Sequence, residues 1–168
     1  MFSKVSKSSP ERSEIDKTRG AALLALNQFE TTKDSLDEAL SSAAANVALN
    51  QLDHRFMRRL VNGVVKMRRR LDFELKFYLA RPSQKLPVKL NNILRLGMYQ
   101  LRFTDKIPAA AAVNESVNLA RYFFGVSQAR LVNGVLRTVL REPERPTLTD
   151  KNIDPVRNLG DHYSFPDY

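Results

Sequence analysis

The sequence contains no cysteine and only two histidines among its 168 residues. The lack of cysteine excludes a disulfide, a thiolate metal site and a thiol nucleophile within this chain. His54 and His162 stand far apart, so we expect neither to act as a general base or in a metal site. The six glycines form no phosphate-binding or dinucleotide-binding loop. We therefore expect no catalytic residue, no cofactor-binding residue and no metal ligand in this chain.

Long apolar runs are also missing, because charged residues interrupt the longest apolar stretches. No segment has the uninterrupted apolar length that a membrane span requires. The polar, serine-rich start, Met1 to Pro10, lacks the apolar stretch of a signal peptide. We expect a cytoplasmic protein without membrane contact. Hydrophobic residues make up 43% of the chain, which is enough for a core at this length.

Apolar residues recur at helical spacing along most of the chain, and no stretch alternates as a strand would. This spacing predicts an all-α bundle of about seven helices. The expected helices are 17–30, 36–49, a segment that begins near 51 and carries Leu52 to Val64, 71–79, a segment between Pro87 and Thr104, 109–124, and a segment that Ser127 caps and that runs to Arg141.

Periodicity and proline content divide the chain into three parts. Residues 1–16 lack periodicity, and we expect a flexible N-terminal segment there. Residues 17–141 are expected to form the helical domain. Four prolines follow within 24 residues, so residues 142–168 are expected to form an extended linker, with at most a short helix near Val156 to His162.

Three local signals refine the helix boundaries and packing. Ser35 and Glu38 have the spacing of a capping box, in which a hydroxyl and a carboxylate satisfy backbone amides at a helix start. Gly97 lies on an apolar stripe between Leu94 and Met98, which predicts a close helix crossing. Gly125 is the expected C-cap of the helix before it.

Positive charge is concentrated in the middle of the chain. The whole sequence carries a formal charge of +9 and has a pI near 10. Residues 55–106 contain fourteen basic and three acidic side chains, whereas residues 20–54 contain five acids and one lysine. This segregation favours a polyanionic partner such as nucleic acid. The alternative is that the basic residues only keep helix surfaces solvated.

Two clusters of side chains are possible contact sites. Arg68, Arg69 and Arg70 are expected at a turn between two helices, where their guanidinium groups either bind phosphates or face solvent. The aromatic run 122–124 could stack on bases, but its place at the end of an amphipathic helix favours the core. The acids at 30, 34, 37 and 38 are explained by their positions at turns and caps.

Four segments, in order, resemble the NusB-like domain family. They are LDHRFMRRLVNG (52–63), ILRLGMYQL (93–101), IPAAAAVNESVNLA (107–120) and VNGVLR (132–137). The family includes free transcription antitermination factors and the N-terminal domain of Sun/Fmu/RsmB-type rRNA cytosine-5 methyltransferases. Four features favour the N-terminal domain of the methyltransferases over the antitermination factors. They are Gln100, the form of residues 106–115, a first helix with only Lys17 and Arg19 as basic residues, and the tail 154–168.

The resemblance implies an RNA-holding domain without catalytic residues of its own. A C-terminal methyltransferase domain of the same polypeptide would bind S-adenosylmethionine and supply the cysteine nucleophile. The expected partner is small-subunit rRNA, and the family implies a monomer or a homodimer. Two other functions stay open: a free-standing antitermination factor that binds RNA with a ribosomal-protein-like partner, and a helical module for protein interactions.

Seven basic residues are candidate RNA contacts. Lys17 and Arg19 are implied by the family's first helix. The other five follow from charge and periodicity alone: Arg58, Arg59, Arg68, Arg69 and Arg70. Asn114 and Asn133 match family positions and are expected to bind backbone groups and join the helices.

Overall fold

The computed structural model describes residues 15–80 and 85–142, and the described chain forms seven α-helices and no strand. The helices are α1 (Lys17–Thr31), α2 (Leu36–Ala45), α3 (Gln51–Lys66), α4 (Arg68–Tyr78), α5 (Val88–Phe103), α6 (Ala109–Phe124) and α7 (Val126–Arg141). The predicted all-α bundle is confirmed. The N-terminal segment 1–14 and the linker 143–168, with its expected short helix, lie outside the described residues.

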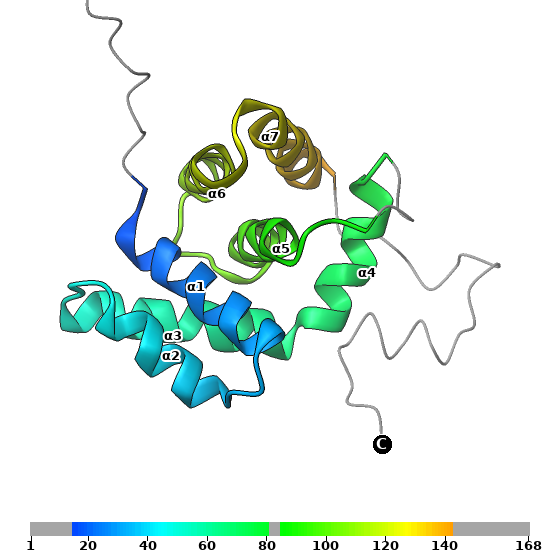
Figure 1. Ribbon diagram of the computed structural model, residues 1–168. Coiled ribbons are helices and arrows are strands. Elements are labelled where there is room, and N and C mark those ends of the chain that lie inside the picture. The colour runs from blue at the N-terminus through cyan, green and yellow to red at the C-terminus, as the bar shows by residue number, and fades with distance from the viewer. Residues whose placement is uncertain (1–14, 81–84, 143–168) are drawn as a thin grey trace, which may run out of the picture.

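Helix α5 runs through the middle of the bundle (Figure 1). Helices α1 to α3 lie on one side of it, α6 and α7 on the opposite side, and α4 lies alongside. Every residue from Asn92 to Gln100 is buried. The sequence predicted an apolar stripe along one face of this helix, but the structure buries the whole circumference because neighbours pack on both sides. The polar side chains of α5 therefore need partners inside the protein.

Three predicted boundaries were wrong. Helix α2 ends at Ala45 and not at Leu49, because the chain must turn there before Asn50 caps α3 by accepting a hydrogen bond from the Asp53 amide at 2.9 Å. Helix α4 begins at Arg68, so the three arginines form its first turn and not a linking turn. Helix α7 begins at Val126, without a cap from Ser127.

Gly125 explains the early start of α7. It ends α6, as predicted, and its φ of 83° lies in the left-handed region, which favours glycine. The same residue is the N-cap position of α7, so a single glycine separates the two helices. The predicted close crossing at Gly97 is also confirmed, since a Cβ there would lie 2.5 Å from Leu136 and 2.8 Å from the Ser116 hydroxyl.

The capping box at the start of α2 is present. The Ser35 amide and hydroxyl both donate to the Glu38 carboxylate at 2.7 Å, and the Glu38 amide donates back to the Ser35 hydroxyl at 3.3 Å. The hydrogen bond from the Ser35 backbone, followed by that from its hydroxyl, lowers the pKa of Glu38 below its ordinary value of 4.5.

This lowered pKa predicts an acid-sensitive helix start. The folded pKa lies below the unfolded one, so the stabilising contribution is present above pH 4.5 and is lost as the pH falls through the folded value. In a carbon-detected NMR titration, Glu38 should titrate below 4.5 in the wild type. Ser35→Ala should raise its pKa part of the way back, because the backbone donor remains. An identical Glu38 titration in both proteins would contradict this origin of the shift.

Candidate nucleic-acid interface

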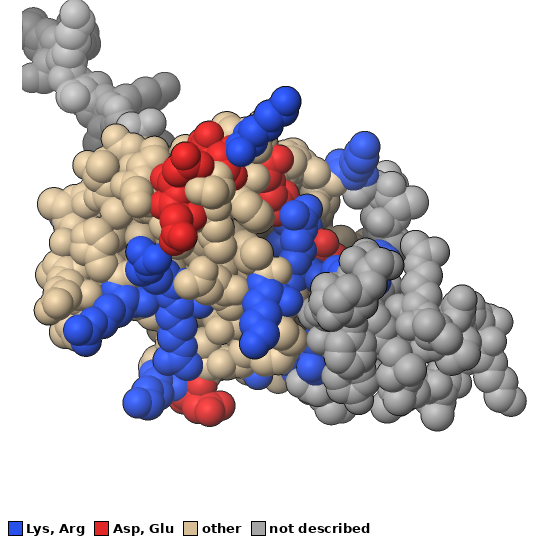
Figure 2. Space-filling view, turned by 90° about the horizontal axis from the view of Figure 1, so that it is seen from below, with Lys and Arg blue, Asp and Glu red and all other residues tan. Residues whose placement is uncertain are grey.

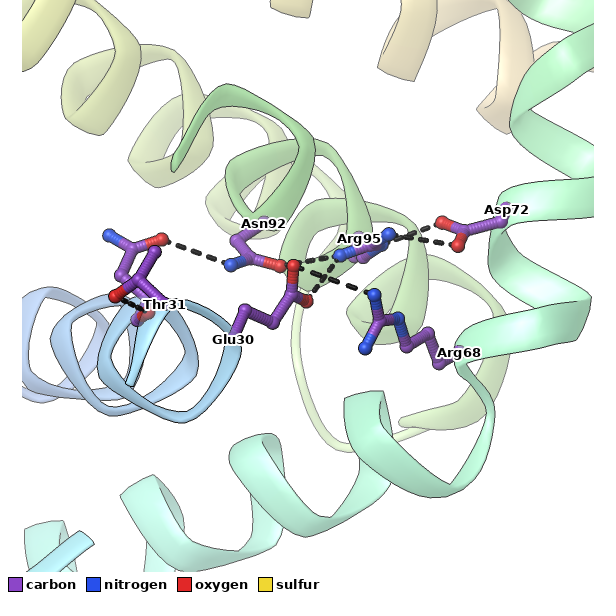
Figure 3. A network of polar contacts seen from close by, with 7 residues as sticks. Glu30, Thr31, Arg68, Asp72, Asn92 and Arg95 are labelled. Carbon is purple, nitrogen blue, oxygen red and sulfur yellow. Dashed lines mark hydrogen bonds and ion pairs between the residues drawn. The ribbon is translucent and has the colours of Figure 1, made fainter. Parts of the chain in front are cut away.

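A buried arginine joins three helices near the predicted basic region (Figure 3). The Arg95 guanidinium of α5 donates to both carboxylate oxygens of Asp72 on α4, at 2.6 and 2.8 Å. It also donates to Glu30 of α1 at 2.6 Å and to Asn92 at 2.8 Å. Burial disfavours its charged form, but the bonds and charges of Asp72 and Glu30 outweigh burial and hold the pKa of Arg95 above its ordinary value. This network fixes α1 and α4 against the central helix.

The three arginines predicted at a turn have different environments in α4. Arg68 is half-exposed, and its guanidinium lies 3.6 Å from the second carboxylate oxygen of Glu30. Arg70 is only 12% exposed, because it is paired with Glu74 at 3.1 Å and stacked over Phe103 at 5.1 Å. Arg69 is partly buried and is also engaged in a contact. These arginines therefore do not form a fully solvated turn.

A second buried ion pair lies beside Arg70. Glu74 is fully buried, and its second carboxylate oxygen lies 3.3 Å from Nε of Arg102. Arg102 also donates to the Tyr78 hydroxyl at 3.1 Å and to the backbone oxygen of Glu142 at 3.3 Å. Burial raises the pKa of Tyr78, although the Arg102 charge opposes the shift. The pair holds α4 and the end of α7 to α5.

Arg19 is turned inward at the start of α1. Its Nε donates to Gln100 Oε1 at 2.7 Å, its guanidinium lies 3.3 Å from Asp16, and it stacks over the Phe56 ring at 5.1 Å. Its side chain is 11% exposed. The sequence identified Gln100 only as a difference within the family, and the structure shows it as the partner of Arg19.

Lys17 is exposed at the rim of a hollow that three acidic residues also line. It lines this hollow of about 420 Å³ together with Asp16, Asp53 and Glu115. This hollow holds one basic side chain and three acidic ones. The local field at the start of α1 is therefore unfavourable for a polyanion.

The outer face of α3 carries the largest run of exposed basic side chains on one described helix. Arg55, Arg58, Arg59 and Lys66 are all exposed there. Arg58 is paired at 3.1 Å with Asp37, which is itself exposed. The face of the molecule that holds α2 and α3 is drawn in Figure 2, where basic side chains gather over one half and most of the acids gather beside them.

The structure therefore places the seven predicted residues in three groups. Lys17 and Arg19 lie at the start of α1, Arg58 and Arg59 lie on the outer face of α3, and Arg68 to Arg70 form the first turn of α4. The seven candidates did not include Arg55, which periodicity places off the apolar stripe of its helix, or Lys66, which lies at helical spacing from Arg59.

Several other sequence predictions are decided by side-chain positions. Phe123 and Phe124 pack against the core as predicted, whereas Tyr122 is 39% exposed and stacks edge-on against Phe123. The prediction for the two asparagines was wrong. Asn114 is exposed, and Asn133 accepts a hydrogen bond from the Arg137 side chain at 2.9 Å, so neither binds a backbone group within the described residues.

Two other kinds of feature are absent from the described part of the chain. No group of His, Asp and Glu side chains in 15–80 and 85–142 could hold a metal ion. No helix in these ranges is long and apolar enough to cross a membrane.

The arrangement of helices and the matching sequence segments lead to a family assignment. The model of the NusB family matches residues 16–141, which is most of the chain. The chain belongs to the NusB family. The NusB domain covers all seven described helices, including both buried arginine networks and the outer face of α3.

Two kinds of protein are found among the curated relatives of this NusB domain. A probable ribosomal RNA small subunit methyltransferase B of Synechocystis is 39% identical over 152 residues, covering 89% of this chain, and that of Bacillus subtilis is 33% identical over 150 residues. The chain spans about a third of the length of these two relatives, 33% in each case. A NusB transcription antitermination protein of Herpetosiphon aurantiacus is 31% identical over 132 residues, covering 76% of this chain and 90% of the relative.

Solved structures show the same fold. NusB of T. maritima superposes with a TM-score of 0.68 at 24% identity, over 80% of this chain and 93% of that protein. NusB in a crystal structure of antitermination factors NusB and NusE with dsRNA gives a TM-score of 0.67 at 21% identity, over 74% of this chain and 94% of that one. The NusB fold is thus established for the described helices.

Proposed function

We propose that this NusB domain binds small-subunit rRNA and positions it for a cytosine-C5 methyltransferase domain of the same polypeptide. The proposal rests on the share of this chain that aligns with the methyltransferase relatives. Alignment to the Synechocystis methyltransferase covers 89% of the chain, which is more than the matched family domain, whereas alignment to the Herpetosiphon and Desulforudis antitermination proteins covers 76% and 75%. Sequence similarity that extends beyond the NusB domain is expected if this chain and the methyltransferase have the same multidomain organisation.

The basic face of the domain supports binding to RNA. Exposed basic side chains gather on α3, and the chain as a whole carries a charge of +9. Phosphate contacts supply most of the non-specific affinity of a protein for nucleic acid and fix its orientation. The NusB protein solved with NusE and dsRNA has the same fold, which is consistent with this function.

The described residues do not fit S-adenosylmethionine. The fold is helical throughout residues 15–80 and 85–142, with no strand that could end in a glycine-rich loop for such a ligand. The whole sequence also lacks the cysteine that attack on C6 of cytosine would require. We assign both the cofactor and the nucleophile to a separate domain, and the role of this domain is to hold the substrate.

A second candidate function is transcription antitermination by a free-standing factor. This candidate is favoured by the share of each relative that aligns with the chain. The alignment covers 90% of the Herpetosiphon antitermination protein and 92% of a Desulforudis antitermination protein. Such a factor would bind RNA together with a protein partner, and it would have no methyltransferase domain.

Deletion of the natural gene separates the two candidates. If the proposal is correct, bisulfite sequencing of the mutant's small-subunit rRNA will show that one 5-methylcytosine is lost, and the natural gene supplied in trans will restore it. Read-through of a terminator placed behind an rRNA leader should stay unchanged. The opposite pair of results, with every methylcytosine retained and read-through reduced, would support the antitermination factor and refute the methyltransferase assignment.

A further inference from the structure

We propose that RNA is held on the outer face of α3, and that this face binds the phosphate backbone of a paired strand. The track, as we name it, consists of Arg55, Arg59, Asn62 and Lys66. This inference rests on the proposed function and adds to it the surface and the form of RNA that is bound. Two of the four residues, Arg55 and Lys66, were not among the contacts that the sequence suggested.

The track residues share one face of a rigid helix. Positions 55, 59, 62 and 66 are separated by four, three and four residues, so their side chains project in the same direction. From Arg55 to Lys66 the helix rises about 16 Å, at about 1.5 Å per residue. Duplex DNA carries one phosphate per about 3.4 Å of each strand, so a track of this length faces several phosphates.

The opposite face of α3 fixes the track in place. Met57, Leu60, Val61 and Val64 are buried in the core, and the helix packs against α1, α4 and α5. The basic side chains therefore stand on an element that is already ordered before RNA arrives. A preformed surface of this kind loses less conformational freedom on binding than a loop would.

The charges of the track are available to a partner. Within the described residues, no ion pair or side-chain hydrogen bond involves Arg55, Arg59 or Lys66. The neighbouring Arg58 differs, because it is paired with Asp37 at 3.1 Å. The cationic groups of the track can thus bind phosphates without first losing a carboxylate partner.

The chemistry of the track favours a paired strand over single-stranded RNA. Proteins hold unpaired bases by stacking them on exposed aromatic side chains. The exposed residues of α3 include no aromatic side chain, since His54 is partly buried and Phe56 is partly buried under the Arg19 guanidinium. Recognition of a duplex needs phosphate contacts and a matching shape, and the track supplies cations in a line.

The start of α1 is a poorer surface for RNA in this chain. Arg19 is turned inward onto Gln100 and Phe56, and Lys17 lies in the hollow with Asp16, Asp53 and Glu115. A phosphate that approached this hollow would meet more negative than positive charge. The charges of the described surface therefore direct RNA to α3.

The test compares two triple variants of the full 168-residue chain. The track variant combines Arg55→Gln, Arg59→Gln and Lys66→Gln. The control variant combines Arg121→Gln, Arg130→Gln and Arg137→Gln on α6 and α7, which lie on the other side of α5 (Figure 1). Both variants lose three positive charges at exposed helical positions, and glutamine preserves helix propensity. Circular dichroism should show the same helix content in all three proteins.

The measurement is binding to an RNA duplex of about 16 base pairs and to a single strand of the same length, across a salt series. The wild type should prefer the duplex. The track variant should bind the duplex about tenfold or more weakly, and its slope of log K against log salt should fall by about 3, or about one per lost contact. The control variant should stay close to wild type in slope.

The outcomes separate the track from the proposed function. Equal weakening by the two variants would mean that net charge, not the track, governs binding, and this would overturn the inference. A wild type that prefers the single strand would also overturn the inference. So would a track variant that binds RNA as tightly as the wild type does, which is the result expected if α3 docks on an acidic protein surface. In these three cases RNA binding by the domain would still stand. Absence of any RNA binding by the wild type would refute the proposed function itself.

Discussion

Replacing Arg95 with leucine should lower the free energy of unfolding by about 3–5 kcal/mol. The guanidinium is 5% exposed and satisfies Glu30, Asp72 and Asn92 at once. Its removal leaves the Glu30 carboxylate, itself only 11% exposed, without its closest cation in a region of low solvent access. Loss of one partner from a buried ion pair costs far more than loss of an exposed pair, because the remaining charge stays desolvated.

Urea denaturation followed by circular dichroism measures this effect. The control is Arg58→Gln, which removes the exposed pair with Asp37 and should change stability by less than about 1 kcal/mol. If Arg95→Leu were as mild as this control, the network of Figure 3 would not be a main attachment of α1 and α4.

A second large effect is expected at Gly97. We expect Gly97→Val to destabilise the fold by about 3 kcal/mol, the upper part of the range for overpacking a core. A Cβ at this position would lie 2.5 Å from a methyl carbon of Leu136 and 2.8 Å from the Ser116 hydroxyl, and both neighbours are buried. The valine would have to push α5 away from α6 and α7, since no open space receives its side chain.

Gly134 provides the matched control, because it is also a helical glycine, but a Cβ added there would have no neighbouring atom within 4 Å. Gly134→Ala should stabilise the protein by up to about 1 kcal/mol through reduced backbone entropy of the unfolded chain. Thermal unfolding of the two variants should therefore shift in opposite directions. If the Gly97→Val variant were as stable as the wild type, the helix crossing at Gly97 could widen without loss of stability.

Secondary structure could be predicted from the sequence where local chemistry decides it. The stripe of α3, the capping box at Ser35 and the glycine at 125 all act within a few residues, and the structure contains each of them. The end of α2 and the start of α4 could not be placed in this way. Both depend on how closely the chain must turn between packed helices, which local propensity does not encode.

The burial and the ion-pair partners of individual charged side chains could not be predicted from the sequence. Arg95 is bonded to residues 65 and 23 positions away, and only the tertiary fold brings Glu30 and Asp72 to it. A count of basic residues treated Arg70 and Arg59 alike, yet one is stacked on Phe103 and paired with Glu74 while the other is exposed. Charge patterning indicated where basic residues are concentrated along the sequence, and side-chain packing decided which of them remain exposed.

The central position of α5 has a consequence for cooperativity. Helices α1 and α3 pack against one side of α5, and helices α6 and α7 pack against the other side. The buried side chains of both sets belong to one continuous core that includes this shared helix, so we expect loss of α5 to expose apolar surface on both sides. If the domain unfolds in one transition, as small single domains usually do, a partner that binds α3 will also stabilise the packing of α6 and α7.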